Sequence, residues 1–473
     1  MLPYRYLAIL ILLPVLPLTC SRVSDLPKTN IVLISIDTLR ADHLSGYGYP
    51  RQTTPNLDRL AREGTVFTRA FSSSSWTIPS HMTMLTSLPA LLHGVDNLGK
   101  SLDSERVTLA ECLKAAGYKT AAFVSGPTLH RAFGFSQGFD LYENLSGIAK
   151  VYYGENPLRN SLAWSIAHET VTGPRVGNRV KQWLAAKAEI PFFLFVHLWD
   201  PHYDYIPPPP YDELFDPDYQ GTFDFSRFES SARINSKMPE REKYHLVALY
   251  DGEIAATDAL IGDLISALEQ EGFKDNTMII VTSDHGEEFF EHGGKGHFKT
   301  LYEEVLHVPL IFHFPGRVKA AQKIHAIFGA IHLMPTILGM VGVPLGTEAK
   351  GDDLSGILRG GHPPEDLESF SSLALMTPLP IYSVRTDDRK YIFRQVKKDP
   401  IELSAVFFDL KRDPGEKQPI SQLDPEARRL FHSYLELIKS YERTARDLPK
   451  AGISEDTIDE KTREQLRSLG YIQ

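Results

Sequence analysis

The sequence predicts an α/β protein built on a doubly wound, mostly parallel sheet and completed by a smaller C-terminal α+β subdomain. Up to about residue 345, aliphatic and β-branched runs that suit strands buried on both faces alternate with helical patterns. Beyond that point the chain changes to short segments such as YSVRTDDRKYIFRQV and AVFFDLKRDP, followed by an amphipathic helix near 425–445. This second sequence pattern indicates a small antiparallel sheet with a packed helix.

The predicted strands of the main sheet are nearly unbroken apolar runs at 30–36, 120–125, 191–198 and 276–283. Helical patterns lie between them at 54–64, 107–117 and 246–272. In doubly wound sheets the ligand site lies at the carboxyl ends of the strands. Asp37, His197 and Asp284 each stand where a strand run expires, so we expect these three side chains to converge on one place.

Residues 204–240 are rich in Pro, Asp and aromatic residues and show no periodicity. Such a stretch is typical of a long excursion over a functional site rather than a core element. We expect substrate selection to reside there.

The composition sets limits on partners and compartment. The formal net charge of -10 opposes broad attraction to nucleic acid, which we exclude as a partner. The only cysteines are Cys20 and Cys112, so no disulfide framework is expected, and Cys112 suits a small buried position in a helix.

The N-terminus resembles an export signal. Arg5 precedes an apolar stretch at 7–18 that is short and interrupted by proline, which favours a signal peptide at 1–20 over a spanning helix. Cys20 suggests a lipoprotein signal, although Thr19 and Pro17 depart from the usual residues before such a cysteine. We predict an exported protein of the periplasm or cell envelope and leave lipid anchoring at Cys20 open; any membrane contact would be through that anchor.

Three stretches, in this order along the chain, resemble the sulfatase family of the alkaline phosphatase superfamily. They are NIVLISIDTLRADHLSGYGYPRQTTPNLDRLAREG from residue 30, WTIPSHMTMLTS from residue 76, and VTSDHGEEFFEHGGKGHFKTLYEEVLHVPLIF from residue 281. The resemblance implies an alkaline-phosphatase-like fold and hydrolysis of sulfate or phosphate esters. It divides the chain into the signal peptide at 1–20, a catalytic domain at 27–345 and the C-terminal subdomain at 346–473.

The resemblance also implies one divalent metal ion, held by Asp37, Thr77, Asp284 and His285. The family usually has two adjacent aspartates after the first strand and Asp-Asn in the third segment, whereas this chain has Asp37-Thr38 and Asp284-His285. An oxygen ligand is lost and a nitrogen ligand gained, which favours Zn²⁺ or Mn²⁺ over Ca²⁺ and leaves Mg²⁺ open.

Thr77 stands where a typical sulfatase carries the cysteine or serine that becomes formylglycine. Threonine cannot be converted to formylglycine, so no such cofactor is expected. We predict that the Thr77 hydroxyl is the nucleophile, activated by the metal. An ordinary helix cap is the alternative reading of this threonine.

Supporting roles follow from the same resemblance. His202 is similar to the sulfatase histidine that contacts the sulfate group, and Lys299 resembles the lysine near the leaving-group oxygen. His297 also suits that second role, and the sequence leaves the choice open. His81 replaces the signature's arginine, and we expect His81, Arg40 and His197 to help bind substrate, unless His197 merely ends its strand.

The sequence therefore predicts an exported, metal-dependent hydrolase acting on a small-molecule, glycan or lipid sulfate or phosphate ester through a threonine. Three alternatives remain: a phosphodiesterase or phosphonoesterase, a phosphoryl-group transferase of the cell envelope, and a catalytically silent protein that binds glycans. Retention of Asp37, Thr77, Asp284 and His285 together argues against the silent protein.

Overall fold

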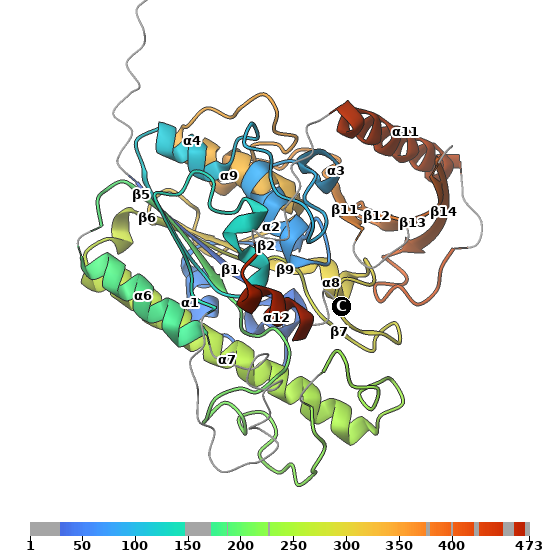
Figure 1. The fold of residues 1–473 in the computed structure, drawn as a ribbon, viewed down its shortest axis with the longest axis horizontal. Helices are drawn as coiled ribbons and strands as arrows, with labels where there is room; N and C mark the ends of the chain where they lie inside the picture. The colour runs from blue at the N-terminus through green and yellow to red at the C-terminus, as the bar shows by residue number, and fades with distance from the viewer. Residues whose placement is uncertain are drawn as a thin grey trace, which may run out of the picture.

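An eight-stranded sheet forms the centre of the computed structural model (Figure 1). The structure describes residues 29–146, 172–186, 188–225, 228–374, 379–398, 401–420, 425–447 and 458–468. In sheet order the strands are β10 (Gln322–Gly329), β2 (Thr65–Phe71), β9 (His307–His313), β6 (Thr277–Ser283), β1 (Asn30–Ile36), β5 (Phe192–Leu198), β3 (Lys119–Val124) and β4 (Leu141–Asn144). Every neighbouring pair is parallel except those made by β9, which runs antiparallel to β6 and β2. The predicted mostly parallel sheet is confirmed.

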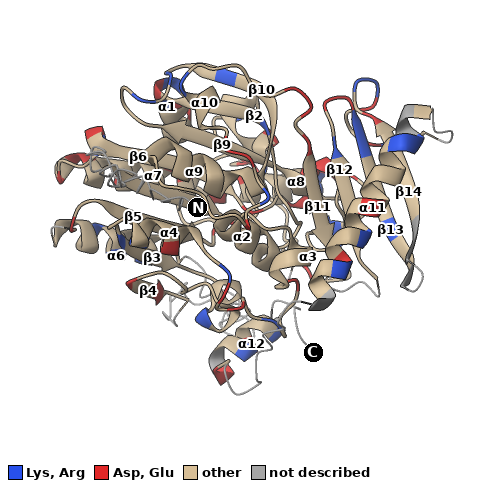
Figure 2. Ribbon diagram, turned by 90° about the horizontal axis from the view of Figure 1, so that it is seen from above, with Lys and Arg blue, Asp and Glu red and all other residues tan. Residues whose placement is uncertain are grey.

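The four strands predicted from sequence lie side by side in the sheet, and their apolar runs reflect burial on both faces. Strands β1, β5 and β6 are buried at every residue and contain no Lys, Arg, Asp or Glu. Strands β5 and β6 are accordingly tan in Figure 2. The sequence analysis missed β10, β2, β9 and β4. Strands β10 and β4 lie at the sheet edges and are partly exposed, so their sequences lack the continuous apolar signal.

Helices cover both faces of the sheet (Figure 1). One face carries α1 (Pro55–Glu63), α6 (Gly173–Ala185) and α7 (Glu240–Gln270), which contact one another through α7. The other carries α2 (Thr77–Thr86), α4 (Leu109–Ala115) and α9 (Leu333–Val341), which also contact one another. No helix in the described ranges is both long enough and apolar enough to span a membrane. The predicted signal peptide at 1–20 and the Cys20 anchor lie outside the described residues.

A second, antiparallel sheet forms the predicted C-terminal subdomain. Its strands are β11 (Ser369–Leu373), β12 (Ile381–Arg385), β13 (Arg389–Lys398) and β14 (Ile401–Asp409), in that order. Helix α11 (Pro425–Asp447) covers one face, and its Tyr434 and Ile438 complete a separate apolar core with Tyr382, Tyr391 and Phe393. The last described helix, α12 (Glu460–Ser468), leaves this sheet and contacts a short 3₁₀ turn at Pro127–Leu129 of the main domain.

The excursion after β5 contains no helix or strand in its described part, up to the start of α7. Aromatic residues attach it to the main domain: Tyr205 packs against Tyr250 of α7 at 5.4 Å between ring centroids, and also against Phe289 at 5.5 Å. Contact between Tyr205 and Phe228 at 5.1 Å joins two parts of the excursion to each other.

Candidate active site

The carboxyl ends of β5, β1 and β6 bring the predicted site residues together. Strand β1 pairs in parallel with both of its neighbours, so the three strands end at the same edge of the sheet. Asp37 directly follows β1, Asp284 directly follows β6, and His197 is the penultimate residue of β5. All three side chains are completely buried.

Four predicted metal ligands surround one position. Ligand atoms of Asp37, Asp284 and His285 all lie within 4.8 Å of one another. The Nε2 atom of His285 is 3.8 Å from Asp37 Oδ1, 3.4 Å from Asp284 Oδ2 and 3.3 Å from the hydroxyl of Thr77. Two carboxylates, an imidazole and a hydroxyl therefore converge from three separate parts of the sequence.

The hydrogen bonds of these residues leave unpaired atoms aimed at that position. Asp284 Oδ1 accepts from the backbone amides of Thr38 and His285, at 3.2 and 2.9 Å, but its Oδ2 has no hydrogen-bond partner in the described chain. Neither carboxylate oxygen of Asp37 has one. His285 donates from Nδ1 to the carbonyl of Gly286 at 2.9 Å, which turns Nε2 toward the aspartates.

Two buried carboxylates beside a single imidazole that can carry charge, His285, are incompletely compensated, and a divalent cation would remove the remaining cost. Burial, and then the charge of Asp284, raise the pKa of Asp37 well above its ordinary value. Burial acts to lower the pKa of His285, but the charges of Asp284 and Asp37 outweigh it and raise that pKa. A cation bound by these residues would have to displace a proton from His285. The residues present thus fit a metal ion.

The backbone beside Asp37 is strained to support this arrangement. Thr38 has a φ of 54°, a left-handed conformation that β-branched residues rarely adopt. Such a conformation costs about 1–3 kcal/mol. It presents the Thr38 amide to Asp284 at 3.2 Å, so the residue that replaces the family's second aspartate orients the other carboxylate.

Thr77 is the first residue of α2 and is not its N-cap. Trp76 occupies the N-cap position, and no side-chain capping bond is present there. The Thr77 hydroxyl is buried and contacts His285 Nε2 at 3.3 Å. The alternative reading of Thr77 as an ordinary helix cap therefore does not describe its position, and its hydroxyl lies at the helix N-terminus, where a bound anion is favoured.

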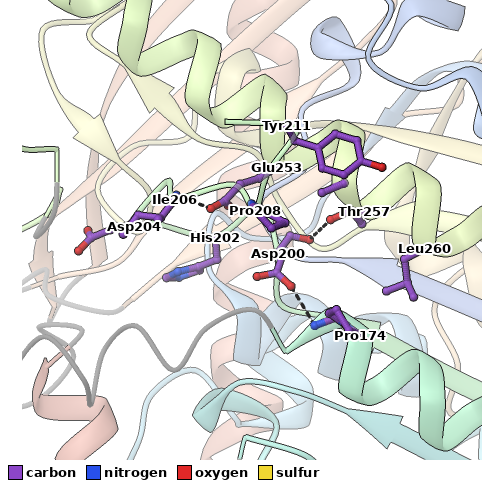
Figure 3. Close-up of a pocket in the computed structure, with 12 residues that line it drawn as sticks. Pro174, Asp200, His202, Asp204, Ile206, Pro208, Tyr211, Glu253, Thr257 and Leu260 are labelled. Atoms are coloured by element: carbon purple, nitrogen blue, oxygen red, sulfur yellow. Dashed lines mark hydrogen bonds between the residues drawn. The ribbon is translucent and has the colours of Figure 1, made fainter. Parts of the chain in front are cut away.

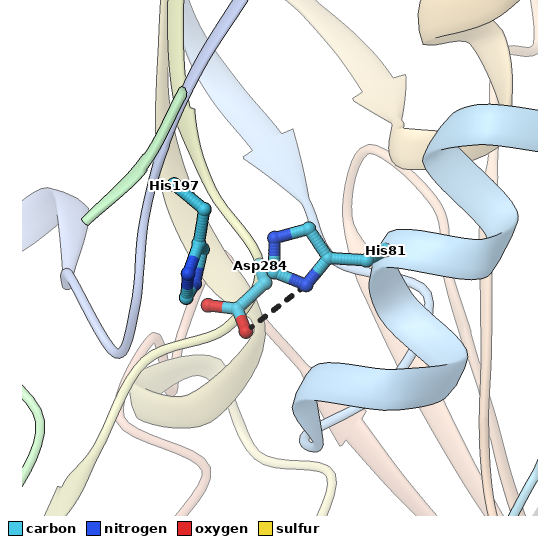
Figure 4. Close-up of side chains that lie close together, drawn as sticks. All are labelled: His81, His197 and Asp284. Atoms are coloured by element: carbon cyan, nitrogen blue, oxygen red, sulfur yellow. Dashed lines mark ion pairs between the residues drawn. The ribbon is translucent and has the colours of Figure 1, made fainter. Parts of the chain in front are cut away.

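His81 lies behind Thr77, one turn further along α2. Its Nδ1 is 2.9 Å from the carbonyl oxygen of Thr77 and 3.5 Å from Asp284 Oδ2 (Figure 4), and its Nε2 is 2.9 Å from the Ser35 hydroxyl. A carbonyl oxygen can only accept, so Nδ1 carries the proton and Nε2 accepts from Ser35. Burial lowers the pKa of His81 to about 3. His81 thus orients the nucleophile and Asp284 from within the protein, in place of the contact with substrate expected from sequence.

His197 adds a third imidazole to the cluster. It donates from Nδ1 to the carbonyl of Ser125 at 2.8 Å, and its Nε2 lies 3.4 Å from Asp37 Oδ2 with no hydrogen-bond partner in the described ranges. His197 therefore suits a ligand or a close neighbour of the metal. It lies beside His81, at 4.9 Å between ring centroids.

His202 and His297 form the opposite wall of the site. The two rings are 5.0 Å apart, and the His297 ring is 4.5 Å from that of His285. His297 Nδ1 is 3.0 Å from Glu287 Oε1, and the Tyr205 hydroxyl donates to Glu287 Oε2 at 2.9 Å. Burial raises the pKa of Glu287 to about 8. The sequence analysis missed Glu287, although an acidic residue two positions after His285 was a usable signal.

Lys299 and Arg40 have partners outside the metal cluster. The Lys299 ammonium pairs with Glu229, and its side chain is 38% exposed. The Arg40 guanidinium contacts Asp42 at 2.7 Å and Glu291 at 2.5 Å. Of the two candidates near the leaving group, the structure therefore places His297 beside the cluster and Lys299 in a surface ion pair.

Comparison with known proteins agrees with this arrangement. Residues 29–343 match the family model of sulfatases, and residues 291–442 match that of the C-terminal region of N-sulphoglucosamine sulphohydrolase. The fold and site define an α/β hydrolase of sulfate or phosphate esters from the alkaline phosphatase superfamily. Within it, the chain belongs to the sulfatase family, whose members are generally metal-dependent.

Individual relatives are distant but cover most of the chain. The ulvan-active sulfatase of Formosa agariphila is 26% identical, over 84% of this chain and 78% of that protein. The multifunctional alkaline phosphatase superfamily protein PehA of Trinickia caryophylli is 25% identical, over 88% and 94% respectively. The crystal structure of the phosphonate monoester hydrolase of Agrobacterium radiobacter has the same fold, with a TM-score of 0.70 at 22% identity over 88% of this chain and 96% of that one.

Proposed function

We propose that this protein is an exported, metal-dependent hydrolase that cleaves phosphodiesters or phosphonate esters faster than sulfate esters, with Thr77 as nucleophile. One observation carries the proposal: the Thr77 hydroxyl and the unpaired oxygens of Asp37 and Asp284 face a common position with His285. The resemblance to a multifunctional superfamily protein over 88% of the chain is consistent with a substrate range wider than sulfate.

Asp37, Asp284, His285 and Thr77 would hold the ion, with His197 next to Asp37. Bound there, a divalent cation supplies positive charge for the Thr77 alkoxide and for the ester oxygens. The mixture of carboxylate and imidazole ligands favours Zn²⁺ or Mn²⁺ over Ca²⁺. Since residue 77 is threonine, the proposal includes no formylglycine.

The protein's own groups divide the remaining work. The Thr77 oxygen attacks phosphorus after its hydroxyl proton has passed to water, and the bond from phosphorus to the leaving oxygen breaks. His297 gives a proton to that oxygen, with Glu287 orienting the imidazole from 3.0 Å. Water then attacks the same phosphorus, the bond from phosphorus to the Thr77 oxygen breaks, and the proton lost by the water restores the Thr77 hydroxyl. A formylglycine sulfatase avoids this second attack because its covalent intermediate collapses by elimination from a hemiacetal. A threonine ester has no such elimination, so we expect a sulfated Thr77 to turn over slowly.

The test is an acid quench during turnover of 4-nitrophenyl esters: a phosphodiester, a phosphonate and a sulfate. The expected result is faster phosphoryl than sulfuryl turnover, with phosphothreonine at residue 77 found by mass spectrometry. Thr77→Ala should abolish both, while Thr83→Ala, which removes another buried hydroxyl from the same helix, should leave the label in place. Sulfate turnover that exceeds phosphodiester turnover and survives Thr77→Ala would refute the nucleophile.

A further inference from the structure

A cavity of about 140 Å³ lies beside the active site, between α7, the start of α6 and the excursion that follows β5 (Figure 3). Its volume is comparable to that of engineered cavities of about 150 Å³, which take up benzene-sized molecules. Three carboxyl-bearing residues line it, Asp200, Asp204 and Glu253, and none of its described lining residues is Lys or Arg.

Glu253 carries the strongest sign of a missing partner. Its side chain is 6% exposed, and its Oε1 accepts from the amide of Ile206 at 2.6 Å. Its Oε2 is buried with no hydrogen-bond partner in the described part of the chain. A buried carboxylate oxygen left unpaired is costly. A ligand that donates a hydrogen bond, or carries a positive charge, would remove that cost.

Asp200 adds a second buried acidic group to the cavity, next to Glu253. Its Oδ2 accepts from the amide of Gly173 at the start of α6, at 3.0 Å. Burial raises the pKa of Asp200 to about 7, and burial followed by the charge of Asp200 raises the pKa of Glu253 well above its ordinary value. Two acidic groups that oppose each other's ionisation are stabilised by a cation placed between them.

The form of the cavity favours an organic cation over a metal ion. Among the described residues, the sets of three metal-ligating side chains whose ligand atoms lie within 4.8 Å of one another are elsewhere, so the cavity offers no three-residue site for a metal ion. The remaining wall is largely apolar, with Pro174, Ile206 and Leu260 available for carbon atoms. An added Cβ at Gly252 would lie 2.5 Å from the Tyr211 carbonyl oxygen, so the excursion packs directly on α7 and the cavity is preformed.

His202 lies between this cavity and the reaction centre. His202 lines the cavity (Figure 3), and its ring is 5.0 Å from that of His297, which in turn is 4.5 Å from His285. A group bound in the cavity would therefore contact the same histidine that borders the reaction centre.

We propose that the cavity binds an alkylammonium group of the ester substrate, with Glu253 and Asp200 accepting from the ammonium and the apolar wall contacting its carbons. This inference rests on the proposed ester hydrolysis and specifies its substrate class. The enzyme would thus select phosphoryl esters that carry a short aminoalkyl chain over neutral ones of the same shape.

The test uses three 4-nitrophenyl phosphodiesters with the same leaving group, whose second alcohol is 3-aminopropyl, butyl or 3-hydroxypropyl. The wild-type enzyme should prefer the aminopropyl ester over the butyl ester by about tenfold or more in kcat/KM, as expected for a desolvated charge pair. Glu253→Gln and Asp200→Asn keep the oxygens that accept from Ile206 and Gly173 but remove the charge. Each should bring the ratio of kcat/KM for the aminopropyl ester to that for the butyl ester close to one.

Glu269→Gln, an exposed position on the same helix, is the matched control and should keep the preference. Equal kcat/KM for the three esters, or a preference for the hydroxypropyl ester, would overturn the inference while leaving ester hydrolysis intact. Calorimetry with butylammonium and butanol decides the question without turnover, because only butylammonium should bind and Glu253→Gln should weaken it. If no ester is hydrolysed but butylammonium still binds in this way, the proposed function fails and the cavity assignment stands.

Discussion

Two buried clusters of carboxylates in this protein differ in whether the chain itself supplies cations to pair with them. Between the C-terminal sheet and the main domain, the Lys390 ammonium is completely buried and lies 3.1 Å from both Glu303 and Glu416. The Glu303 amide also donates to Glu416 at 2.7 Å. At the strand ends, by contrast, Asp37 and Asp284 are buried with unpaired oxygens.

We infer from this difference that the cluster around Lys390 stabilises the fold, whereas the cluster of Asp37 and Asp284 suits the binding of a ligand. Around Lys390 the protein supplies two cations for two carboxylates, since Arg385 also lies 3.7 Å from Glu303, so the charges are compensated as soon as the chain folds. At the strand ends the cationic candidates are imidazoles. Burial lowers the pKa of His197 to about 4 and of His81 to about 3, which keeps both neutral, whereas Asp284 and Asp37 raise the pKa of His285, so that one imidazole faces two carboxylates. The second carboxylate has no cationic partner among the described residues, and the cluster therefore fits a bound cation.

The largest effect is expected when a carboxylate of the cluster at the strand ends is neutralised, and it falls on catalysis. Asp37→Asn should remove stoichiometric metal and lower kcat/KM by about a thousandfold, since several kcal/mol of charge stabilisation disappear. The metal-free variant should be at least as stable as the metal-free wild type, because one of two repelling carboxylates is gone. Metal analysis and chemical denaturation in a chelator measure the two effects. Asp275→Asn, at an exposed position, is the control, and clear destabilisation of metal-free Asp37→Asn would contradict the comparison.

Substitution in the cluster around Lys390 should instead lower the stability of the fold without changing metal content. Lys390→Met leaves Glu303 and Glu416 buried without their shared ammonium, and should lower the free energy of unfolding by about 3–5 kcal/mol. Metal content of the folded fraction should not change. Lys411→Met removes an exposed lysine, 2.6 Å from Asp388, and should cost at most about 1 kcal/mol. Equal losses for the two lysine variants would show that Lys390 is not structurally special.

A smaller effect is expected at His81, which connects Thr77 and Asp284 without facing substrate. His81→Leu removes the Nδ1 donor and should lower kcat by about 10–100-fold, as for other residues that orient metal ligands. His81→Asn places an amide donor near the Nδ1 position and should recover part of the loss. KM should move little in either variant. A rise in KM with unchanged kcat would instead place His81 in contact with substrate.

The sequence was sufficient to predict the central strands and the residue types at the site. Strands β1, β3, β5 and β6 are recognisable because burial on both faces demands a continuous apolar run. Asp37 and Asp284 follow two such runs, and adjacent parallel strands must end at one edge of the sheet. Local patterns therefore predicted the convergence of these side chains.

Side-chain partners were decided only by the folded structure. Lys299 and His297 are two residues apart, yet one pairs with Glu229 at the surface and the other lies buried against Glu287. The sequence could not separate them, because each partner is supplied by packing between distant segments. The cavity likewise needs Asp200 from the end of β5 and Glu253 from the middle of α7. Apolar periodicity reports only whether a residue is buried, whereas the direction of a polar side chain depends on long-range contacts that no local pattern records.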